Sequence, residues 1–199
     1  MIDGGPGDDD IAGDDGNDVL RGGDGTDYID GGAGTDRIEG GPGNVQDLRG
    51  GPGNDLVLGG PGRDNLFGDD GNDVLRGGDG KDYAEGGAGN DRIEAGRSER
   101  GSGPQVLRGG PGRDVIVGGP DRDDARGDEG NDKLFGGGGD DRLYGGPGVD
   151  ACSGGAGRDF CDGGPPGRSR RSSRDRDLCA KDVERIRGCR RVARIRRPG

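Results

Sequence analysis

The fold of this chain is decided by one stretch, residues 22–30, which read GGDGTDYID. The same pattern, Gly-Gly-x-Gly-x-Asp-x-apolar-x, begins at Gly4 and recurs with few interruptions to Asp162. Each repeat is nine residues long, and we number its positions from the first glycine. Position six then holds an aspartate and position eight an apolar residue in most repeats. The chain is therefore a repeat array and not an ordinary globular domain.

The position-six aspartates are the candidate metal ligands. They return every nine residues in three runs: Asp9, Asp18, Asp27 and Asp36; Asp55, Asp64, Asp73, Asp82 and Asp91; Asp114, Asp123, Asp132, Asp141, Asp150 and Asp159. We expect the glycines at positions one, two and four to take positive φ and turn their carbonyls inward. Calcium prefers a mixture of carboxylate and carbonyl oxygens, so stacked turns of this kind predict columns of Ca²⁺ sites.

Composition indicates that the array does not fold on its own. The 199 residues include 53 glycines, and only 25% are hydrophobic. One aliphatic residue in nine buries too little apolar surface to offset the entropy lost by a glycine-rich chain. Residues 1–164 hold 16 Lys or Arg against 36 Asp or Glu, a net charge of −20. A divalent cation would cancel this self-repulsion, so we expect metal binding and folding to be one equilibrium.

The nonamer resembles the calcium-binding repeat of the RTX, or hemolysin-type, family over about four fifths of the chain. The resemblance implies an all-β fold, a right-handed parallel β-roll (β-solenoid) in which two nonamers form one coil. Repeats n and n+2 then stack, and the fifteen aspartates bind calcium between them. Uninterrupted n/n+2 pairs of aspartates predict about nine ions or more.

We predict three segments. Residues 1–162 form the β-roll, residues 163–177 a flexible linker rich in Pro, Arg and Ser, and residues 178–199 a basic, cysteine-containing tail. Two breaks interrupt the array, where Gln46 and Gln105 replace the aspartate, and these turns are predicted to be weak or empty metal sites. Gly40 and residues 95–99 are the apparent insertions. Residues 13–39 and 68–94 differ at only four positions, which indicates duplication of a block of six nonamers.

The four cysteines, Cys152, Cys161, Cys179 and Cys189, favour disulfides and an oxidising environment. Cys152 and Cys161 both fall at position eight, so they would face each other across the roll, and Cys179 and Cys189 would then close a small loop. Sequence alone allows three pairings. Zinc is the competing interpretation, but the chain has neither a Cys-x-x-Cys motif nor any histidine. In the tail, Cys179, Val183 and Ile186 have helical spacing, although so short a pattern also suits a strand.

Other functional classes fit the sequence less well. Without histidine there is no His-dependent catalytic triad, and we expect no enzyme. An acidic linker would not need an apolar residue after each aspartate, and ice binding would need rows of threonine that the chain lacks. We expect no nucleic-acid partner for so acidic an array, although the arginine-rich stretch Arg190–Arg197 could contact an anionic polymer or the roll itself. No apolar run is longer than three residues, so no membrane span is expected.

The resulting hypothesis is a secreted, extracellular calcium-binding module that folds when it meets calcium outside the cell. The chain opens on Met1-Ile2-Asp3, which matches the last three positions of a repeat. The alternative is therefore a C-terminal accessory part of a larger secreted enzyme, toxin or adhesin whose active domain lies upstream.

Overall fold

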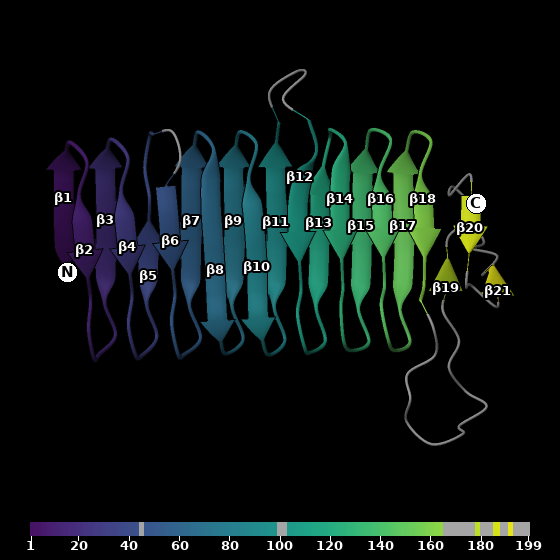
Figure 1. The fold of residues 1–199 in the computed structure, drawn as a ribbon, viewed down its shortest axis with the longest axis horizontal. Coiled ribbons are helices and arrows are strands. Elements are labelled where there is room, and N and C mark those ends of the chain that lie inside the picture. The colour runs from purple at the N-terminus through teal and green to yellow at the C-terminus, as the bar shows by residue number, and fades with distance from the viewer. Residues whose placement is uncertain (44–45, 99–102, 165–177, 180–184, 188–190, 193–199) are drawn as a thin grey trace, which may run out of the picture.

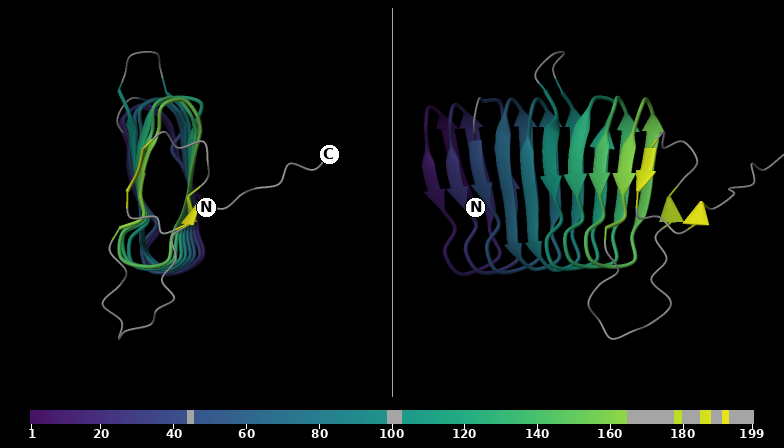
Figure 2. Two further views of the ribbon diagram at one scale, coloured as in Figure 1. Left: turned by 90° about the vertical axis from the view of Figure 1, so that its right-hand side faces the viewer. Right: turned by 45° about the vertical axis from the view of Figure 1, so that its right-hand side comes forward.

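The computed structural model describes residues 1–43, 46–98, 103–164, 178–179, 185–187 and 191–192. These residues form two parallel sheets that face each other across a narrow interior (Figure 1, Figure 2). Consecutive strands alternate between the sheets, so two strands and two turns make one coil of a parallel β-roll. The predicted fold class is confirmed. No helix among the described residues is long and apolar enough to cross a membrane.

Odd-numbered strands form one sheet and even-numbered strands the other. The odd sheet contains β1 (Ile2–Pro6), β3 (Val19–Asp24), β5 (Arg37–Glu39), β7 (Leu56–Pro61), β9 (Val74–Asp79), β11 (Arg92–Arg97), β13 (Val115–Gly119), β15 (Lys133–Gly138), β17 (Ala151–Ala156), β19 (Leu178–Cys179) and β21 (Arg191–Val192). The even sheet contains β2 (Asp10–Ala12), β4 (Tyr28–Asp30), β6 (Gln46–Arg49), β8 (Asp64–Asp70), β10 (Tyr83–Ala88), β12 (Gln105–Arg108), β14 (Asp123–Arg126), β16 (Arg142–Tyr144), β18 (Phe160–Asp162) and β20 (Arg185–Arg187).

The nonamer sets the register of the sheets. In regular coils a residue pairs with the residue 18 positions later, as Leu20 does with Ile38. Side chains alternate along a strand, so position eight always points inward while positions seven and nine point outward. The inward residues stack as two facing columns, and Leu20, Ile38 and Leu75 have no exposed surface. The predicted inward face is therefore confirmed as a core one residue thick on each side.

The structure corrects the position of both insertions. The coil from Asp36 to Asp55 spans 19 residues and that from Asp91 to Asp114 spans 23, against 18 in a regular coil. Gly41 has the positive φ of position two, and its N–H donates to Gly59, so Gly40 is a regular position-one residue and not an insertion. The extra residue lies between Gly43 and Gln46.

The second insertion is displaced in the same way. Gly96 pairs with Gly78 and Arg97 with Asp79, so Ala95 stands at position one and the five extra residues lie between Ser98 and Gln105. The sequence alone does not locate the two insertions, because glycines lie on both sides of each. The hydrogen bond of Gly41 and the pairing of Gly96 place the glycines before each insertion in the regular coil.

The C-terminal end of the roll carries a disulfide between Cys152 and Cys161, whose Cα atoms are 6.4 Å apart. It joins β17 to β18 across the interior and confirms the predicted pairing. Beyond it, β19 pairs with β17, β20 with β18 and β21 with β19, so the tail adds strands to both sheets. Ile186 therefore lies in a strand and not in a helix. Cys189 and residues 165–177 lie outside the described residues, so the second bridge and the linker stay predictions.

We expect Leu75→Ala to lower the free energy of unfolding in saturating calcium by about 2–5 kcal/mol, because it removes a fully buried side chain between Val57 and Ile93. Leu58→Ala is the matched control, since Leu58 is a half-buried, outward residue of the neighbouring strand. Its cost should be about 1 kcal/mol or less. Denaturant unfolding measures both, and equal losses would contradict the inward assignment of position eight.

Candidate metal centre

The position-six aspartates lie inside the turns of the roll. Thirteen of the fifteen predicted ligands are buried, with 2% or less of their surface exposed. The other two, Asp9 and Asp18, belong to the first turns of the array and are half-buried. A carboxylate of this kind is costly to bury unless something compensates its charge.

The turns divide the candidate ligands into two columns, one at each rim of the roll. The upper column, at the upper edge of Figure 1, connects odd strands to even strands. Its position-six residues are Asp9, Asp27, Gln46, Asp64, Asp82, Gln105, Asp123, Asp141 and Asp159. The lower column connects even strands to odd strands, and its position-six residues are Asp18, Asp36, Asp55, Asp73, Asp91, Asp114, Asp132 and Asp150. Both glutamines therefore fall in the upper column.

Stacked aspartates are linked by a repeated hydrogen bond. The N–H of each Asp in the lower column donates to Oδ1 of the Asp in the next coil, in seven consecutive bonds of 2.7–2.9 Å. Four such bonds of 2.9–3.1 Å occur in the upper column. The lower ladder continues across both insertions, through Asp36 to Asp55 and Asp91 to Asp114, which sequence pairing missed. Oδ1 thus holds neighbouring coils in register.

The second carboxylate oxygen points toward position one of its own turn, and in most described turns it has no hydrogen-bond partner. In thirteen of the described turns Oδ2 is buried without a hydrogen bond, as in Asp27 and Asp73. A Cβ built on Gly22 would lie 2.2 Å from Oδ2 of Asp27 and 2.7 Å from the carbonyl oxygen of Gly40 in the next coil. In a turn that carries aspartate, position one must therefore be glycine, because two oxygens of different coils converge there.

Backbone carbonyls complete the oxygen-lined space between stacked turns. A Cβ on Gly23 or Gly25 would lie 2.0 or 1.9 Å from the carbonyl oxygens of Gly5 and Gly7 in the coil before. Most glycines at positions two and four have positive φ, as predicted, with values of 111° at Gly23 and 148° at Gly25. Position-one glycines do not, which corrects the prediction: their requirement is steric and not conformational.

This donor set fits calcium. Within the described residues no three His, Cys, Asp or Glu side chains form a compact cluster, so backbone carbonyls must supply most ligands of any ion. Ca²⁺ accepts carbonyl and carboxylate oxygens together and tolerates irregular geometry. Zinc and softer metals prefer nitrogen or sulfur ligands, which these turns do not offer.

Without a cation the buried carboxylates resist ionisation. Burial, reinforced by the charge of Asp141, raises the pKa of Asp123 to about 8. Burial also raises the pKa of Asp64 and Asp73 to about 7, with nearby aspartates adding to the effect. The same cause brings the pKa of Asp55 and Asp132 to about 6. A divalent ion between the turns would remove this penalty, because it favours the charged form.

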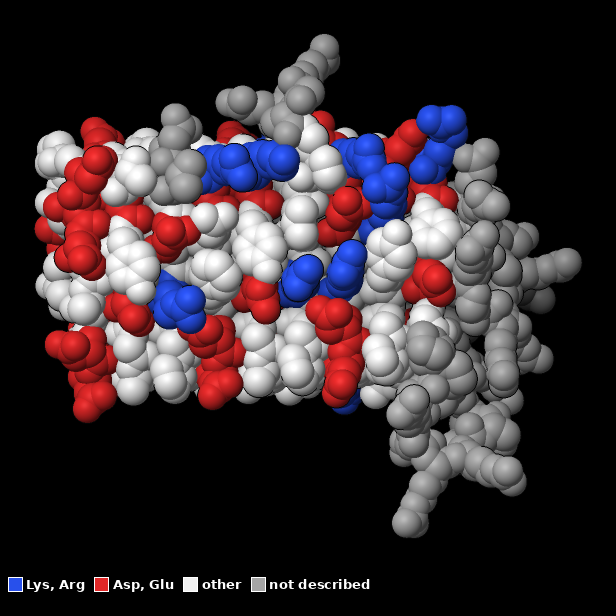
Figure 3. Space-filling model, viewed as in Figure 1, with Lys and Arg blue, Asp and Glu red and all other residues white. Residues whose placement is uncertain are grey.

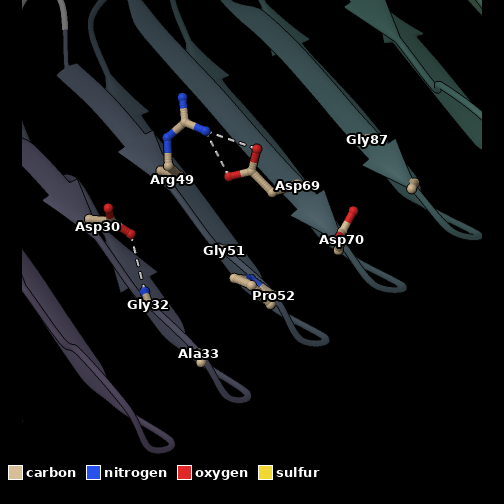
Figure 4. Close-up of a pocket in the computed structure, with 10 residues that line it drawn as sticks. Asp30, Gly32, Ala33, Arg49, Gly51, Pro52, Asp69, Asp70 and Gly87 are labelled. Carbon is tan, nitrogen blue, oxygen red and sulfur yellow. Dashed lines mark hydrogen bonds and ion pairs between the residues drawn. The ribbon is translucent and has the colours of Figure 1, made fainter.

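Other acidic side chains lie on the outer side of the turns and make ordinary surface contacts. Figure 4 shows a shallow groove on the outside of the lower rim, where Arg49 Nη1 lies 2.9 and 3.0 Å from the two carboxylate oxygens of Asp69. Asp69 occupies position two with a φ of 70°, a conformation that Asp tolerates better than most residues. Asp14 and Asp128 share this φ in equivalent turns. These carboxylates face the exterior and do not belong to the candidate site.

A pair of substitutions in one turn tests the steric role of position one. Gly136→Ala would place Cβ 2.2 Å from Oδ2 of Asp141 and 2.6 Å from the carbonyl oxygen of Gly154, so we expect a clear loss of calcium affinity. Gly138 stands at position three, where other repeats carry Pro or Ala, and Gly138→Ala should leave affinity unchanged. Calorimetric titration of both variants checks this, and similar affinities would contradict the proposed cradle.

The pKa shifts predict an unusual pH dependence for the calcium-free protein. Burial raises the pKa of Asp55, Asp73 and Asp123 from 3.8 to about 6, 7 and 8, so between the unfolded and folded values the folded chain holds more protons. Stability without calcium is therefore greatest at acid pH and is lost as the pH rises through 6–8. Circular dichroism in EDTA should show more β-structure at pH 5 than at pH 8.

In calcium we expect the opposite pH dependence, with more β-structure at pH 8 than at pH 5. Protons compete with the ion for the carboxylates, so the affinity for calcium rises with pH. A calcium-free protein that gains β-structure as the pH rises would show that the carboxylates are not buried as described.

Comparison with known proteins agrees with this geometry. The sequence profile described as RTX calcium-binding nonapeptide repeat (4 copies) matches residues 3–38, 12–46, 47–75, 67–98, 100–134 and 126–161. No curated protein matches the chain. The profile covers most of the sequence, and its repeats bind Ca²⁺. The stacked turns, their buried aspartates and these matches together show that the chain belongs to the family of RTX calcium-binding nonapeptide-repeat proteins.

Proposed function

We propose that this protein is a secreted structural module that folds when it binds calcium outside the cell. The single observation that carries the proposal is the row of buried carboxylates whose Oδ2 atoms have no partner. A buried polar group left unpaired costs about 1–3 kcal/mol, and a charged one costs more. Repeated through thirteen turns, this cost exceeds the total stability of an ordinary domain. The folded roll therefore depends on a ligand that fills the turns.

Stacked aspartates give the expected number of ions. Seven Asp–Asp pairs in the lower column and four in the upper column share a hydrogen bond, eleven pairs in all. The sequence predicts at least nine ions. The pairs Asp36/Asp55 and Asp91/Asp114 raise this expected number to eleven. Position-six aspartates, with carbonyls of positions one, two and four, would hold one ion between each pair. Calcium neutralises an array that otherwise repels itself.

The extracellular setting is supported by two properties of the chain. The Cys152–Cys161 disulfide crosses the interior between β17 and β18, and such bonds persist in oxidising compartments. Extracellular modules bind calcium with dissociation constants of about 0.1–1 mM, which matches the calcium available outside cells. In low calcium the acidic array stays unfolded, and at its destination it folds.

An accessory role fits the surface better than catalysis does. The fifteen aspartates occupy equivalent turns, and no pair of them sits in an environment suited to separate acid and base roles. On the face shown in Figure 3, basic and acidic side chains are interspersed over the described residues. Ion pairs such as Arg21–Glu39 and Arg76–Glu94, at 2.9 and 3.0 Å, link neighbouring coils. The module therefore serves as a rigid, calcium-dependent spacer or support.

We expect a far-ultraviolet circular dichroism titration from EGTA into calcium to show a cooperative rise in β-structure at pH 7.5. Each ion that binds only the folded state adds about 2.7 kcal/mol at a hundredfold excess over its dissociation constant. Magnesium at the same concentration is the control and should give little change, because it demands a regular octahedron and keeps its waters. Full β-structure in EGTA, or an equal response to magnesium, would overturn the proposal.

A further inference from the structure

The two columns of turns are not equivalent. The lower column keeps aspartate at position six through eight consecutive turns, and its ladder of hydrogen bonds is unbroken. The upper column is interrupted twice, at Gln46 and Gln105. Both glutamine side chains are fully buried, although each begins a strand at the rim of the roll. What these amides do inside the turn decides whether the upper column can hold a continuous row of ions.

Gln46 occupies the place of the aspartate, but its side chain donates a hydrogen bond where the carboxylate of Asp would accept one. A Cβ on Gly40 would lie 1.7 Å from Oε1 of Gln46, the position that Oδ2 of Asp occupies in other turns. The other end, Nε2, stands where Oδ1 would be and donates to the carbonyl oxygen of Gly41 at 3.1 Å. That carbonyl belongs to position two, whose carbonyl would face the ion in the turns proposed to bind calcium. The amide thus supplies a hydrogen-bond donor within the turn and brings no negative charge.

The Gln105 turn differs from its neighbours in a second way. Ala95 occupies position one of this turn and is 99% buried, with 1% of its surface exposed. In equivalent turns a Cβ at position one would lie 2.2–2.6 Å from Oδ2, as at Gly77 and Gly109. The Ala95 methyl group therefore fills the space in which a carboxylate oxygen and a cation would meet. The five-residue insertion between Ser98 and Gln105 falls in the same turn.

Each glutamine also changes the aspartate of the next coil. Elsewhere the N–H of the residue at position six donates to Oδ1 of the following Asp. Asp123, which follows Gln105, has no partner for either carboxylate oxygen, whereas the backbone N–H of Gln46 still interacts with the carboxylate of Asp64 outside normal hydrogen-bond geometry. Asp64 remains linked to Asp82, and Asp123 to Asp141, on the far side. The contact between coils is therefore lost between Gln105 and Asp123 and weakened between Gln46 and Asp64, while the contact on the far side of each aspartate is intact.

We propose that the turns of Gln46 and Gln105 hold the upper rim without a metal ion. This inference rests on the calcium-binding function proposed above. The lower column then carries one continuous row of calcium sites along the whole roll. The upper column carries three separate groups, formed by Asp9 with Asp27, Asp64 with Asp82, and Asp123 with Asp141 and Asp159.

The residues at position five also differ between the two rims, and the difference again favours cation binding at the lower rim. In the upper column this position carries the basic residues Arg63, Lys81, Arg122 and Arg158 against the acidic residues Asp8 and Asp140, and Figure 3 shows basic side chains along the upper edge. In the lower column it carries mostly Asn or Thr, and Asn54, Asn72 and Asn90 form their own ladder, with bonds of 2.8–3.1 Å. A fixed positive charge beside a turn weakens cation binding, modestly where the side chain is exposed. The lower rim is the better cation site on both counts.

Counting bound ions by native mass spectrometry in calcium tests the proposal. Asp73→Ala removes a residue with an aspartate on both sides and should lose two ions relative to the wild type. Asp64→Ala has Gln46 on one side and should lose one. Asp141→Ala is the control within the upper column, because it has Asp on both sides and should lose two. Equal losses for Asp64→Ala and Asp141→Ala would overturn the proposal, because the Gln46 turn would then hold an ion.

Gain of ions provides a test that does not depend on destabilised variants. Q46D restores a carboxylate between Asp27 and Asp64, and A95G/Q105D restores both the carboxylate and the space beside it. We expect each to bind one or two ions more than the wild type and to melt at a higher temperature in calcium. Unchanged ion counts in both variants would contradict the inference. A wild-type chain that binds no calcium would instead refute the proposed function itself.

Discussion

Burial of one carboxylate in every turn is the constraint on which the rest of the structure depends. The aspartate at position six uses Oδ1 to accept an N–H from the neighbouring coil and leaves Oδ2 facing a space lined by backbone oxygens. The first contact sets the register between coils, and the second creates a demand for a cation. Burial raises the pKa of carboxyls such as that of Asp73, so at neutral pH a turn without a cation opposes folding. On this basis we propose that the repeat makes folding conditional on its ligand, because the apolar core is only one residue thick on each side.

Glycine serves this constraint in two distinct ways. At positions two and four it allows the positive φ that turns carbonyls toward the next coil, while at position one it leaves room for the carboxylate and a neighbouring carbonyl to meet. Ala95 is informative because it breaks the second rule only where Gln105 has already replaced the aspartate. The duplicated block contains six nonamers, which make three whole coils. A duplicated glutamine therefore returns to the same rim, and the other rim keeps its aspartates without interruption.

Sequence was sufficient for the fold because the period of nine specifies both turn and strand. The aspartates, the inward residues at position eight and the Cys152–Cys161 bridge all lie where the repeat predicts. The insertions were misplaced, since glycines on both sides of each gap allow several alignments and only hydrogen bonds distinguish them. The link between Asp36 and Asp55 was missed for the same reason, because a coil of 19 residues appears as a break in a linear pattern. The two rims differ because alternate repeats stack at opposite edges of the roll. This difference is visible in the structure and not in the linear order of the repeats.

Anomalous X-ray diffraction from crystals grown in calcium tests the central claim most directly, because it locates each ion without reference to affinity. The account predicts a regular row of anomalous peaks between the stacked aspartates of the lower column, continuous from Asp18 to Asp150. Along the upper column it predicts peaks in three groups, separated at Gln46 and Gln105. Peaks at exterior carboxylates such as Asp69, with none between the buried aspartates, would contradict the account.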